Sequence, residues 1–418
     1  MKFLFRSGLF SVGLLCSGAL HSITIDLNYT YDTNGFFDQE GSKEAMRAVA
    51  DYFESRINDN LLAIDQDSFG MSASWSARFT HPGTGATQSI PGLVVPEDTL
   101  VIYVGGRSLG SAAGLAGPGG YAASGTSAWI DLLASRGQAG ALAATASDFG
   151  PWGGSISFDS GRSWHFELDG RPTGSNSDFV SVALHEMGHV LGVGTSSSWQ
   201  DQIDANNLFQ GAFSVAAFGG GVPVDSFRGH WQDDGVCTLP LGYDPENALN
   251  VLSLTSVSFG TAHALEQIAL MDPSSCTVSS FTELKVLTDL DWAALRDIGW
   301  EVFLPLELGN SVLSPSGVSF TWPTSTGQSY SLEQTTDLTV PWTSVTGTVD
   351  GDGEVAVYTD ASPPAGKAFY RLATAGVVAS SLVVTVQEAV ASEDTSEALI
   401  EFSTAEPRWV EGCGVCSH

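Results

Sequence analysis

The chain has 418 residues, of which 47 are acidic and 16 are basic, so its formal net charge at pH 7 is -31. This excess of negative charge argues against nucleic acid and anionic membrane surfaces as partners, because their phosphates would be repelled. Hydrophobic residues make up 43% of the chain and charged residues 15%, which excludes global disorder. The length indicates two or three domains.

The first 22 residues are typical of a secretory signal peptide. Lys2 and Arg6 precede an apolar stretch at residues 9–15, and small residues follow at positions 17–19. The apolar stretch is too short to span a bilayer permanently, and no later segment is long enough for a transmembrane helix. We therefore expect a secreted or cell-surface protein whose mature chain has no membrane span. A hydrophobic first strand is the alternative.

Four cysteines follow the signal sequence: Cys237, Cys276, Cys413 and Cys416. An even number of cysteines in an exported chain favours disulfides, and three pairings are possible. The last two cysteines have C-x-x-C spacing, but no βαβ unit precedes them. A clip in the tail or unpaired thiols therefore fit better than a redox role.

Residues 23–303 are expected to form one domain that mixes strands and helices. Apolar residues recur at helical spacing after Ser42, which predicts a helix that ends near Asn58. Alternating or β-branched residues predict strands at residues 23–31, 73–79, 99–104 and 155–159. Residues 105–154 are rich in Gly, Ala and Ser. We interpret them as loops flanking a cleft, with a short helix around residues 128–135.

An H-E-x-x-H arrangement lies within residues 182–194, which read V-A-L-H-E-M-G-H-V-L-G-V-G. Asp178 can cap a helix here, and apolar residues recur at helical spacing. On such a helix His185 and His189 share one face, where two imidazoles can bind one zinc ion. Glu186 could then reach a water at the metal. The alternative is a buried helix with two hydrogen-bonded histidines.

A catalytic zinc takes three protein ligands and leaves a fourth position for water. On the short spacing H-E-x-x-H-x-x-G-x-x-H the third ligand would be residue 195, which is Thr195, a poor zinc ligand. The glycine of that longer pattern is present as Gly192. The third ligand must therefore come from elsewhere. His230, in a Gly-His-Trp turn, is preferred to the other candidates, which are His263, Asp201, Asp204 and Glu266.

Two further segments complete the domain. Residues 269–274, A-L-M-D-P-S, pass from apolar residues into a turn after Met271. Residues 288–298 predict an amphipathic helix, which Thr288 can cap and in which Asp291 occupies the reciprocal position.

The composition changes from Leu304 onward. Short predicted strands separated by Gly, Pro, Ser and Asp indicate a small all-β sandwich over residues 304–375. Residues 376–418 form a tail that can add one or two strands before the C-x-x-C pair.

Several of these segments together resemble metzincin-type zinc endopeptidases: H-E-M-G-H-V-L-G, the later H-W, A-L-M-D-P-S and L-T-D-L-D-W-A-A-L-R-D-I-G-W-E-V. The combination is similar to exported bacterial proteins with a displaced third histidine, as in leishmanolysin-like enzymes. The resemblance covers residues 23–303. It implies an α+β domain with a mixed twisted sheet, a zinc-binding helix, and a tight turn at Met271 beneath the zinc. The departures are Thr195 and the long segment between His230 and the Met271 turn.

We therefore expect a secreted endopeptidase that acts on protein or peptide substrates, with Zn2+ held by His185, His189 and His230. Zinc polarises the scissile carbonyl and lowers the pKa of its water, and Glu186 passes the water proton to the leaving amine. By family analogy, an extended substrate could pair with an edge strand, which we place at residues 155–159. The alternative is a noncatalytic exported adhesin or binding protein on a protease-like fold.

Overall fold

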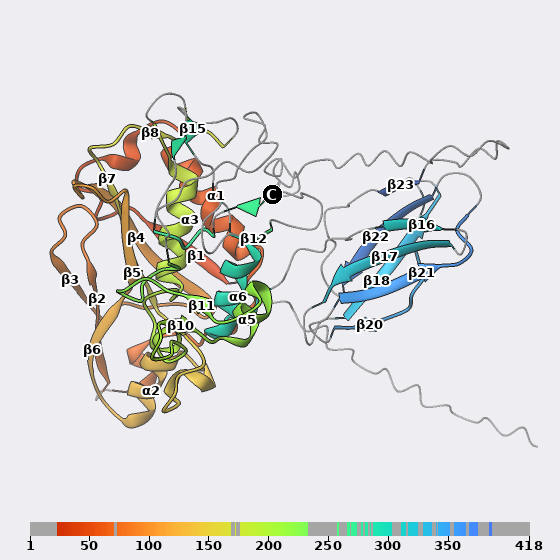
Figure 1. The fold of residues 1–418 in the computed structure, drawn as a ribbon. Helices are drawn as coiled ribbons and strands as arrows, with labels where there is room; N and C mark the ends of the chain where they lie inside the picture. Colours follow the sequence, from red (N-terminus) through yellow and green to blue (C-terminus); the bar gives the residue numbers. More distant parts are fainter. Residues whose placement is uncertain are drawn as a thin grey trace, which may run out of the picture.

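The structure of the protein is a computed structural model, drawn as a ribbon in Figure 1. It describes residues 23–70, 73–168, 172, 176–232, 257–258, 266–267, 269–273, 277–278, 281–282, 285, 287–302, 311–314, 317–324, 329–336, 340, 342–351, 355–364, 368–374 and 384–386. The predicted signal peptide, His263, the tail from residue 387 and the four later cysteines lie outside these residues. The expected disulfides and the boundary near residue 304 therefore stay predictions.

The framework is a four-stranded sheet in the order β1-β4-β7-β5. Its strands are β1 (Thr24–Asn28), β4 (Thr99–Arg107), β7 (Gly153–Asp159) and β5 (Gly114–Pro118). The first three strands run parallel, whereas β5 runs antiparallel to β7 and forms one edge of the sheet. Together with the helices described below, this mixed sheet confirms the predicted α+β class.

Alternation along β4 supplies side chains to two cores, one on each face of the sheet. The larger core contains α1 (Ser42–Glu54) and α3 (Phe179–Val190), together with the β4 residues Leu100, Ile102 and Val104. The intervening residues Val101 and Tyr103 enter the second core. The two helices therefore cover one face of the sheet only.

The second core joins β4 to a three-stranded antiparallel sheet of order β3-β2-β6. Its strands are β2 (Ser74–Thr80), β3 (Thr87–Pro91) and β6 (Gly120–Ser124), and α2 (Ser127–Ser135) follows β6. Large aromatic side chains fill this core, among them Trp75, Trp129 and Trp152. Strand β6 continues from β5 through Gly119, so the chain passes directly from the edge of the main sheet into the smaller one.

Two expectations for this region are wrong. Residues 105–154 are not only loops, because β5 and β6 lie within them. Their glycines and alanines give no β-branched signature, and pairing with β7 and β2 imposes the extended conformation. Residues 155–159 are not an edge strand either, since β7 lies between β4 and β5. The free edge next to β7 belongs to β5.

Helix α6 (Asp289–Asp297) forms as predicted, with a reciprocal capping box between Thr288 and Asp291. The side chain of Asp297, the last residue of α6, also accepts hydrogen bonds from the N–H groups of Phe213 and Ser214. These two residues lie at the start of α5 (Ala212–Phe218), a helix that was not predicted from the sequence.

In the part of the chain that the structure describes, no helix is long and apolar enough to cross a membrane. The remaining short elements are η1 (Phe36–Asp38), η2 (Gln66–Phe69), η3 (Ala139–Leu142), β8 (Trp164–His165), β9 (Ser177–Asp178), α4 (Ser197–Gln200), β10 (Leu208–Phe209), β11 (Val222–Pro223), β12 (Val257–Ser258), β13 (Glu266–Gln267), β14 (Thr277–Val278) and β15 (Phe281–Thr282).

A third core lies in the C-terminal part of the chain. Two antiparallel sheets contribute to it, one of order β16-β17-β21 and one of order β19-β18-β22-β23 with β20 also paired to β18. Phe320, Leu332 and Tyr370 are buried together in this cluster, as expected for a small β-sandwich. The strands are β16 (Ser311–Ser314), β17 (Gly317–Pro323), β18 (Ser329–Thr335), β19 (Thr343–Ser344), β20 (Val349–Asp350), β21 (Val355–Asp360), β22 (Ala368–Thr374) and β23 (Val384–Val386).

Candidate metal centre

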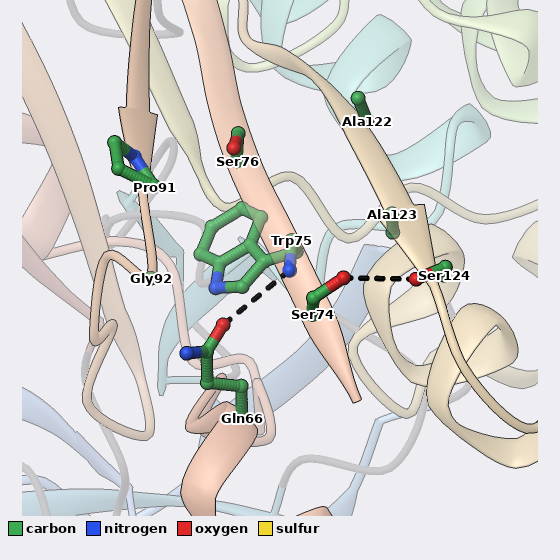
Figure 2. A pocket seen from close by; sticks show the side chains of 9 residues that line it. All are labelled: Gln66, Ser74, Trp75, Ser76, Pro91, Gly92, Ala122, Ala123 and Ser124. Atoms are coloured by element: carbon green, nitrogen blue, oxygen red, sulfur yellow. Dashed lines mark hydrogen bonds between the residues drawn. The ribbon is translucent and has the colours of Figure 1, made fainter. Parts of the chain in front are cut away.

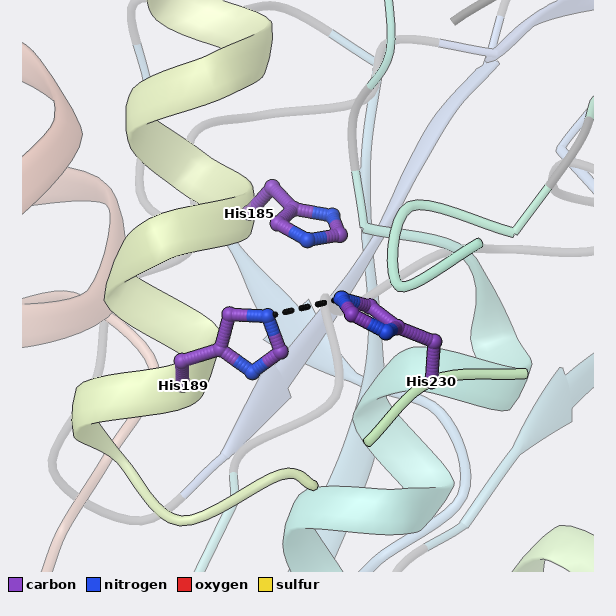
Figure 3. Close-up of side chains that lie close together, drawn as sticks. All are labelled: His185, His189 and His230. Carbon is purple, nitrogen blue, oxygen red and sulfur yellow. Dashed lines mark hydrogen bonds between the residues drawn. The ribbon is translucent and has the colours of Figure 1, made fainter. Parts of the chain in front are cut away.

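Helix α3 carries the H-E-x-x-H residues. It begins after Asp178, whose Oδ2 accepts a hydrogen bond from the N–H of Ser181 at 2.7 Å. Its apolar side chains enter the larger core, and this packing leaves His185 and His189 on a common side of the helix (Figure 3). Just beyond the helix, Gly192 adopts a φ of 107°, which an L side chain rarely reaches. The chain turns sharply there and leaves the helix axis.

His230 reaches α3 from a short loop, residues 225–230, which we call the His230 loop. An antiparallel bridge between Val224 and Trp231 closes the base of the loop. Inside it, the N–H of Asp225 donates a hydrogen bond to the carbonyl of His230 at 3.0 Å. The imidazole is therefore presented by a closed turn.

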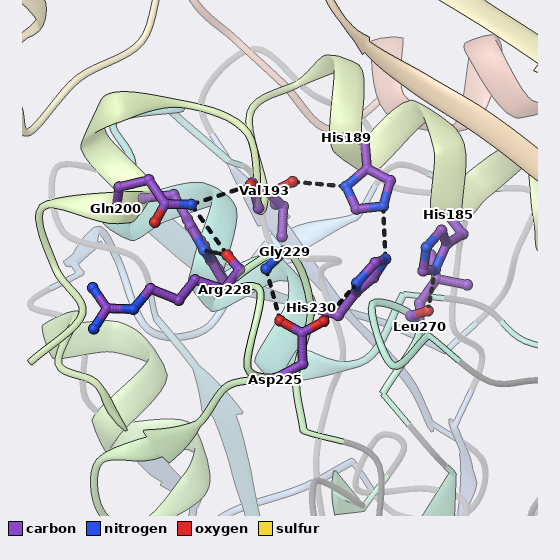
Figure 4. A network of polar contacts seen from close by, with 11 residues as sticks. His185, His189, Val193, Gln200, Asp225, Arg228, Gly229, His230 and Leu270 are labelled. Carbon is purple, nitrogen blue, oxygen red and sulfur yellow. Dashed lines mark hydrogen bonds and ion pairs between the residues drawn. The ribbon is translucent and has the colours of Figure 1, made fainter. Parts of the chain in front are cut away.

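The His230 loop docks on the turn that follows α3. Gly194 has a φ of 75°, and a Cβ added to it would lie 1.9 Å from the carbonyl oxygen of Gly229. Next to this contact, Nε2 of Gln200 donates a hydrogen bond to the carbonyl of Arg228 at 3.1 Å (Figure 4). Nε1 of Trp199 donates to the same carbonyl at 2.8 Å. These contacts bring the third histidine to the helix although it lies 41 residues after His189.

The three imidazoles converge in space (Figure 3). Their ligand atoms all lie within 4.8 Å of one another, and Nε2 of His189 lies 3.1 Å from Nε2 of His230. Two nitrogen ligands on a tetrahedral zinc, with bonds of about 2.0–2.1 Å, are about 3.3 Å apart. The ring of His230 is also stacked on that of His185, with centroids 5.3 Å apart. The spacing therefore fits a single ion between the rings.

Each imidazole has an oxygen acceptor near its Nδ1 atom (Figure 4). These acceptors are the carbonyl of Leu270 for His185 at 2.7 Å, the carbonyl of Val193 for His189 at 2.9 Å, and Oδ2 of Asp225 for His230 at 3.3 Å. Because carbonyl and carboxylate oxygens only accept, they place the ring proton on Nδ1 and leave the lone pair on Nε2. Lone pairs that face each other repel unless a cation lies between them. The donor set therefore suits a metal ion.

Burial favours the neutral, metal-binding form of these histidines. It lowers the pKa of His185 well below the ordinary value, and the two neighbouring imidazoles add to the effect. Burial likewise lowers the pKa of His189 to about 4 and lowers that of His230, where Asp225 opposes the shift. Among the described residues, these three form the only group that could hold a metal. Neutral imidazole is the form that coordinates metals.

The side chain of Glu186, on α3, lies against the edge strand β5. The residue is 6% exposed, and a Cβ added to Gly114 would lie 2.4 Å from its Oε1. Glycine at this position of β5 therefore leaves the space that the carboxyl group occupies. Burial raises the pKa of Glu186 to about 8, and a cation bound nearby would oppose this shift.

The turn at Met271 contacts the histidine-bearing segments. A Cβ added to Gly188 would lie 2.6 Å from Sδ of Met271, so the methionine packs against α3 between its two histidines. The carbonyl of Met271 accepts a hydrogen bond from the N–H of Trp231 at 3.1 Å. Asp291 on α6 in turn accepts hydrogen bonds from the N–H groups of Leu270 and Met271, at 2.7 and 3.1 Å. The position of this turn agrees with a supporting role, which stays a prediction.

Among the described residues, the other candidate ligands do not join the group. Thr195 donates a hydrogen bond from its hydroxyl to the carbonyl of His189 at 2.6 Å, which caps the end of the helix. The carboxylates of Asp201 and Asp204 accept backbone hydrogen bonds in nearby loops. The two remaining candidates, His263 and the side chain of Glu266, lie outside the described part of the structure.

A cavity of about 510 Å³ lies on the smaller sheet (Figure 2), and none of the three histidines lines it. Small side chains line most of it, and the hydroxyls of Ser74 and Ser124 already bond each other at 2.9 Å. None of the predicted site residues lines it. The lining residues are Gln66, Ser74, Trp75, Ser76, Pro91, Gly92, Ala122, Ala123 and Ser124.

Sequence reasoning missed the residues that support the site. Asp225 carries a weak signal, since Asp before a glycine-containing turn often accepts backbone hydrogen bonds. Gly114, Gly194 and Gly229 carry no signal of their own among the 47 glycines of the chain. Their importance follows from close approaches that only the tertiary structure reveals.

An α+β domain in which an H-E-x-x-H helix supplies two of three clustered histidines has the arrangement of a metzincin-type metalloprotease. Comparison with known proteins supports this class. Residues 131–206 match the matrixin family, and the matched segment contains α3 but ends before His230. The metalloendoproteinase 4-MMP of Arabidopsis thaliana is 40% identical over 58 residues, which are 14% of this chain and 17% of that protein. The match thus spans less than a fifth of this relative. No solved structure matches the chain significantly.

Proposed function

We propose that the protein is a secreted zinc endopeptidase whose metal is held by His185, His189 and His230. The convergence of three imidazoles, each with an acceptor at Nδ1, is the observation that carries the proposal. The matrixin match supports peptide-bond hydrolysis, and Zn2+ is the metal that three histidines and one open position commonly bind. The N-terminal sequence supports export to the medium or the cell surface.

Zinc bound at this site would supply Lewis-acid chemistry by polarising the scissile carbonyl and lowering the pKa of a water molecule. Glu186 accepts a proton from the attacking water while the water oxygen adds to the carbonyl carbon. The same carboxyl then delivers the proton to the nitrogen as the C–N bond breaks. One water is consumed, and a carboxylic acid and an amine are formed.

The substrate strand in this proposal is β5, in place of residues 155–159. Strand β5 is paired with β7 on one side and lies at the edge of its sheet. An extended peptide can add to such an edge through main-chain hydrogen bonds. Because Gly114 on β5 touches Glu186, a peptide bound along this edge would pass beside the carboxyl group.

The domain organisation follows the same proposal. Residues 23–303 would form the catalytic domain, and residues 304–375 a separate β module with a tail after it. The separate hydrophobic clusters support this division, because no residue of the third core belongs to the first two.

The test is Glu186→Gln in the full-length mature chain, compared with Glu97→Gln at an exposed position. We expect both variants to bind about one zinc per chain. Cleavage of a denatured protein should fall by roughly 10²–10⁴-fold in Glu186→Gln, because a general base contributes about this factor. Undiminished cleavage by Glu186→Gln would disprove the proposed mechanism.

Metal content separates this function from a noncatalytic adhesin on a protease-like fold. The unsubstituted protein should bind zinc, whereas an adhesin that has lost its metal site would not. The His230→Ala variant should lose most of this zinc. Full occupancy in His230→Ala would instead show that another residue supplies the third ligand.

A further inference from the structure

The three histidines differ in the kind of oxygen that faces Nδ1. His185 and His189 face neutral backbone carbonyls, at 2.7 and 2.9 Å, whereas His230 faces the carboxylate of Asp225 at 3.3 Å. The two helical histidines are also held by α3 itself. His230 lies in a loop, so its side chain needs a separate support.

Asp225 spans the His230 loop with both side-chain oxygens (Figure 4). Its Oδ1 accepts a hydrogen bond from the N–H of Gly229 at 2.8 Å, and its Oδ2 faces Nδ1 of His230. The N–H of Asp225 donates to the carbonyl of His230 at 3.0 Å. One residue therefore contacts both the backbone and the imidazole of the histidine that completes the group.

We propose that Asp225 is a positioning residue that holds His230 in the orientation and tautomer needed to bind the metal. This inference rests on the proposed zinc site and deepens it. The carboxylate fixes the ring proton on Nδ1, so that Nε2 keeps its lone pair towards His189. Its negative charge also makes Nε2 a stronger donor than a carbonyl partner would, and partly balances the charge of the bound ion.

A role of Asp225 in holding the loop backbone does not explain why its Oδ2 faces the imidazole of His230. The backbone of the loop is already anchored where Arg228 receives hydrogen bonds from Trp199 and Gln200, and where Gly229 packs against Gly194. Oδ1 of Asp225 adds one more backbone contact. Oδ2 contributes nothing to this anchoring and serves only the imidazole.

The experiment compares zinc affinity in Asp225→Ala, Asp225→Asn and the unsubstituted full-length mature chain, by competition with a coloured chelator near neutral pH. We expect Asp225→Ala to bind zinc on the order of 10- to 100-fold more weakly, the usual loss when the partner of a ligating histidine is removed. Asp225→Asn can still accept from Gly229 but has no charge to offer His230. The zinc affinity of Asp225→Asn should lie between those of Asp225→Ala and the unsubstituted chain.

A matched control is Asp204→Asn, because Asp204 accepts hydrogen bonds from the N–H groups of Asn206 and Leu208 in a neighbouring turn but faces no histidine. It should bind zinc as tightly as the unsubstituted chain. Unfolding of the metal-free proteins reports any general loss of structure. The proposal also predicts that NMR of metal-free protein shows the His230 ring proton on Nδ1, and that Asp225→Ala shifts this signal.

The outcomes separate the two proposals. If the unsubstituted chain binds zinc and cleaves protein, but Asp225→Ala and Asp225→Asn bind zinc equally well, the role of Asp225 is wrong and the proposed function stands. If the unsubstituted chain takes up no zinc, the proposed function fails. If the His230 ring signal in the metal-free protein then does not respond to Asp225→Ala, the positioning role fails as well.

Discussion

Gly194 lies so close to Gly229 that a Cβ added to Gly194 would be 1.9 Å from the carbonyl oxygen of Gly229. The first glycine belongs to the turn that ends the H-E-x-x-H helix, and the second immediately precedes His230. This backbone contact sets the position of the third histidine relative to the other two. It replaces, in this chain, the short connection that a histidine at position 195 would have made.

Gly194→Ala should separate the His230 loop from the end of α3. The methyl group would overlap a backbone atom, which cannot rotate away, and the φ of 75° is itself unfavourable for alanine. We expect strongly weakened zinc binding together with a lower midpoint of urea unfolding. Both are measured on the purified variant, the first by chelator competition and the second by circular dichroism.

Gly219→Ala is the matched control for this change. Gly219 has a φ of 87°, but a Cβ there would meet no atom within 4 Å. Gly219→Ala should therefore lower the free energy of unfolding by roughly 1–2 kcal/mol, because alanine is unfavourable in the left-handed conformation. It should leave zinc affinity unchanged. Equal effects of the two substitutions on zinc binding would show that the contact with Gly229 does not position His230.

Gly114→Ala should lower turnover without removing the metal. Its Cβ would lie 2.4 Å from Oε1 and 2.5 Å from Cγ of Glu186, so the carboxyl group must move. A displacement of about 1 Å at a catalytic group can cost on the order of 10²-fold in rate. We expect a loss of that order in kcat/KM for a peptide substrate, with zinc content unchanged.

Gly117→Ala provides the comparison on the same strand, because a Cβ there meets nothing within 4 Å. Both substitutions add the same methyl group to β5. If Gly114→Ala cleaves the substrate as fast as Gly117→Ala, Glu186 either tolerates the methyl group or does not act from the position seen in the structure.

Local sequence patterns predicted the elements whose signals are local. The cap at Asp178, the capping box of Thr288 with Asp291, and the β-branched residues of β4 are signals from residues a few positions apart. Hydrogen bonds at helix ends and the period of apolar residues are set within these windows. The α+β class could be predicted from them for the same reason.

The remaining features depend on contacts between distant segments. Strand β5 is extended because it pairs with β7, and nothing in Gly114 to Pro118 favours a strand by itself. The sequence could not decide between His230 and His263, because either can be brought near the helix by a loop of sufficient length. The docking of Gly229 on Gly194 brings His230 there, and that contact has no sequence signature.

Asp59 should make the stability of the domain depend on pH. Its side chain is buried and accepts a hydrogen bond from the N–H of Glu301 at 3.0 Å. Burial raises the pKa of Asp59 from 3.8 to about 7, and the negative charges of Glu301, Asp148 and Asp98 act in the same direction. Between about pH 4 and pH 7 the folded protein therefore keeps a proton that the unfolded chain has released.

Because the folded state binds more protons at Asp59 in this range, the contribution of Asp59 to the free energy of unfolding falls as the pH rises from about 4 to about 7. This stabilisation is fully present below the pKa of Asp59 in the unfolded chain. It is lost as the pH rises through the pKa of Asp59 in the folded protein. Asp59→Asn imitates the neutral carboxyl group and should flatten this fall. We expect the variant to equal the unsubstituted protein near pH 4 and to exceed its urea midpoint above pH 7, both measured without metal, since zinc binding is itself pH-dependent.

Asp204→Asn tests whether any aspartate would have this effect. Hydrogen bonding from the N–H of Leu208 lowers the pKa of Asp204, so the contribution of Asp204 to stability has the opposite sign. The contribution of Asp204 is present above its pKa in the unfolded chain. It is lost only as the pH falls through its lower pKa in the folded protein. The slope between about pH 4 and pH 7 should thus be unchanged in Asp204→Asn. An unchanged slope in Asp59→Asn as well would mean that Asp59 is already ionised in the folded protein across this range.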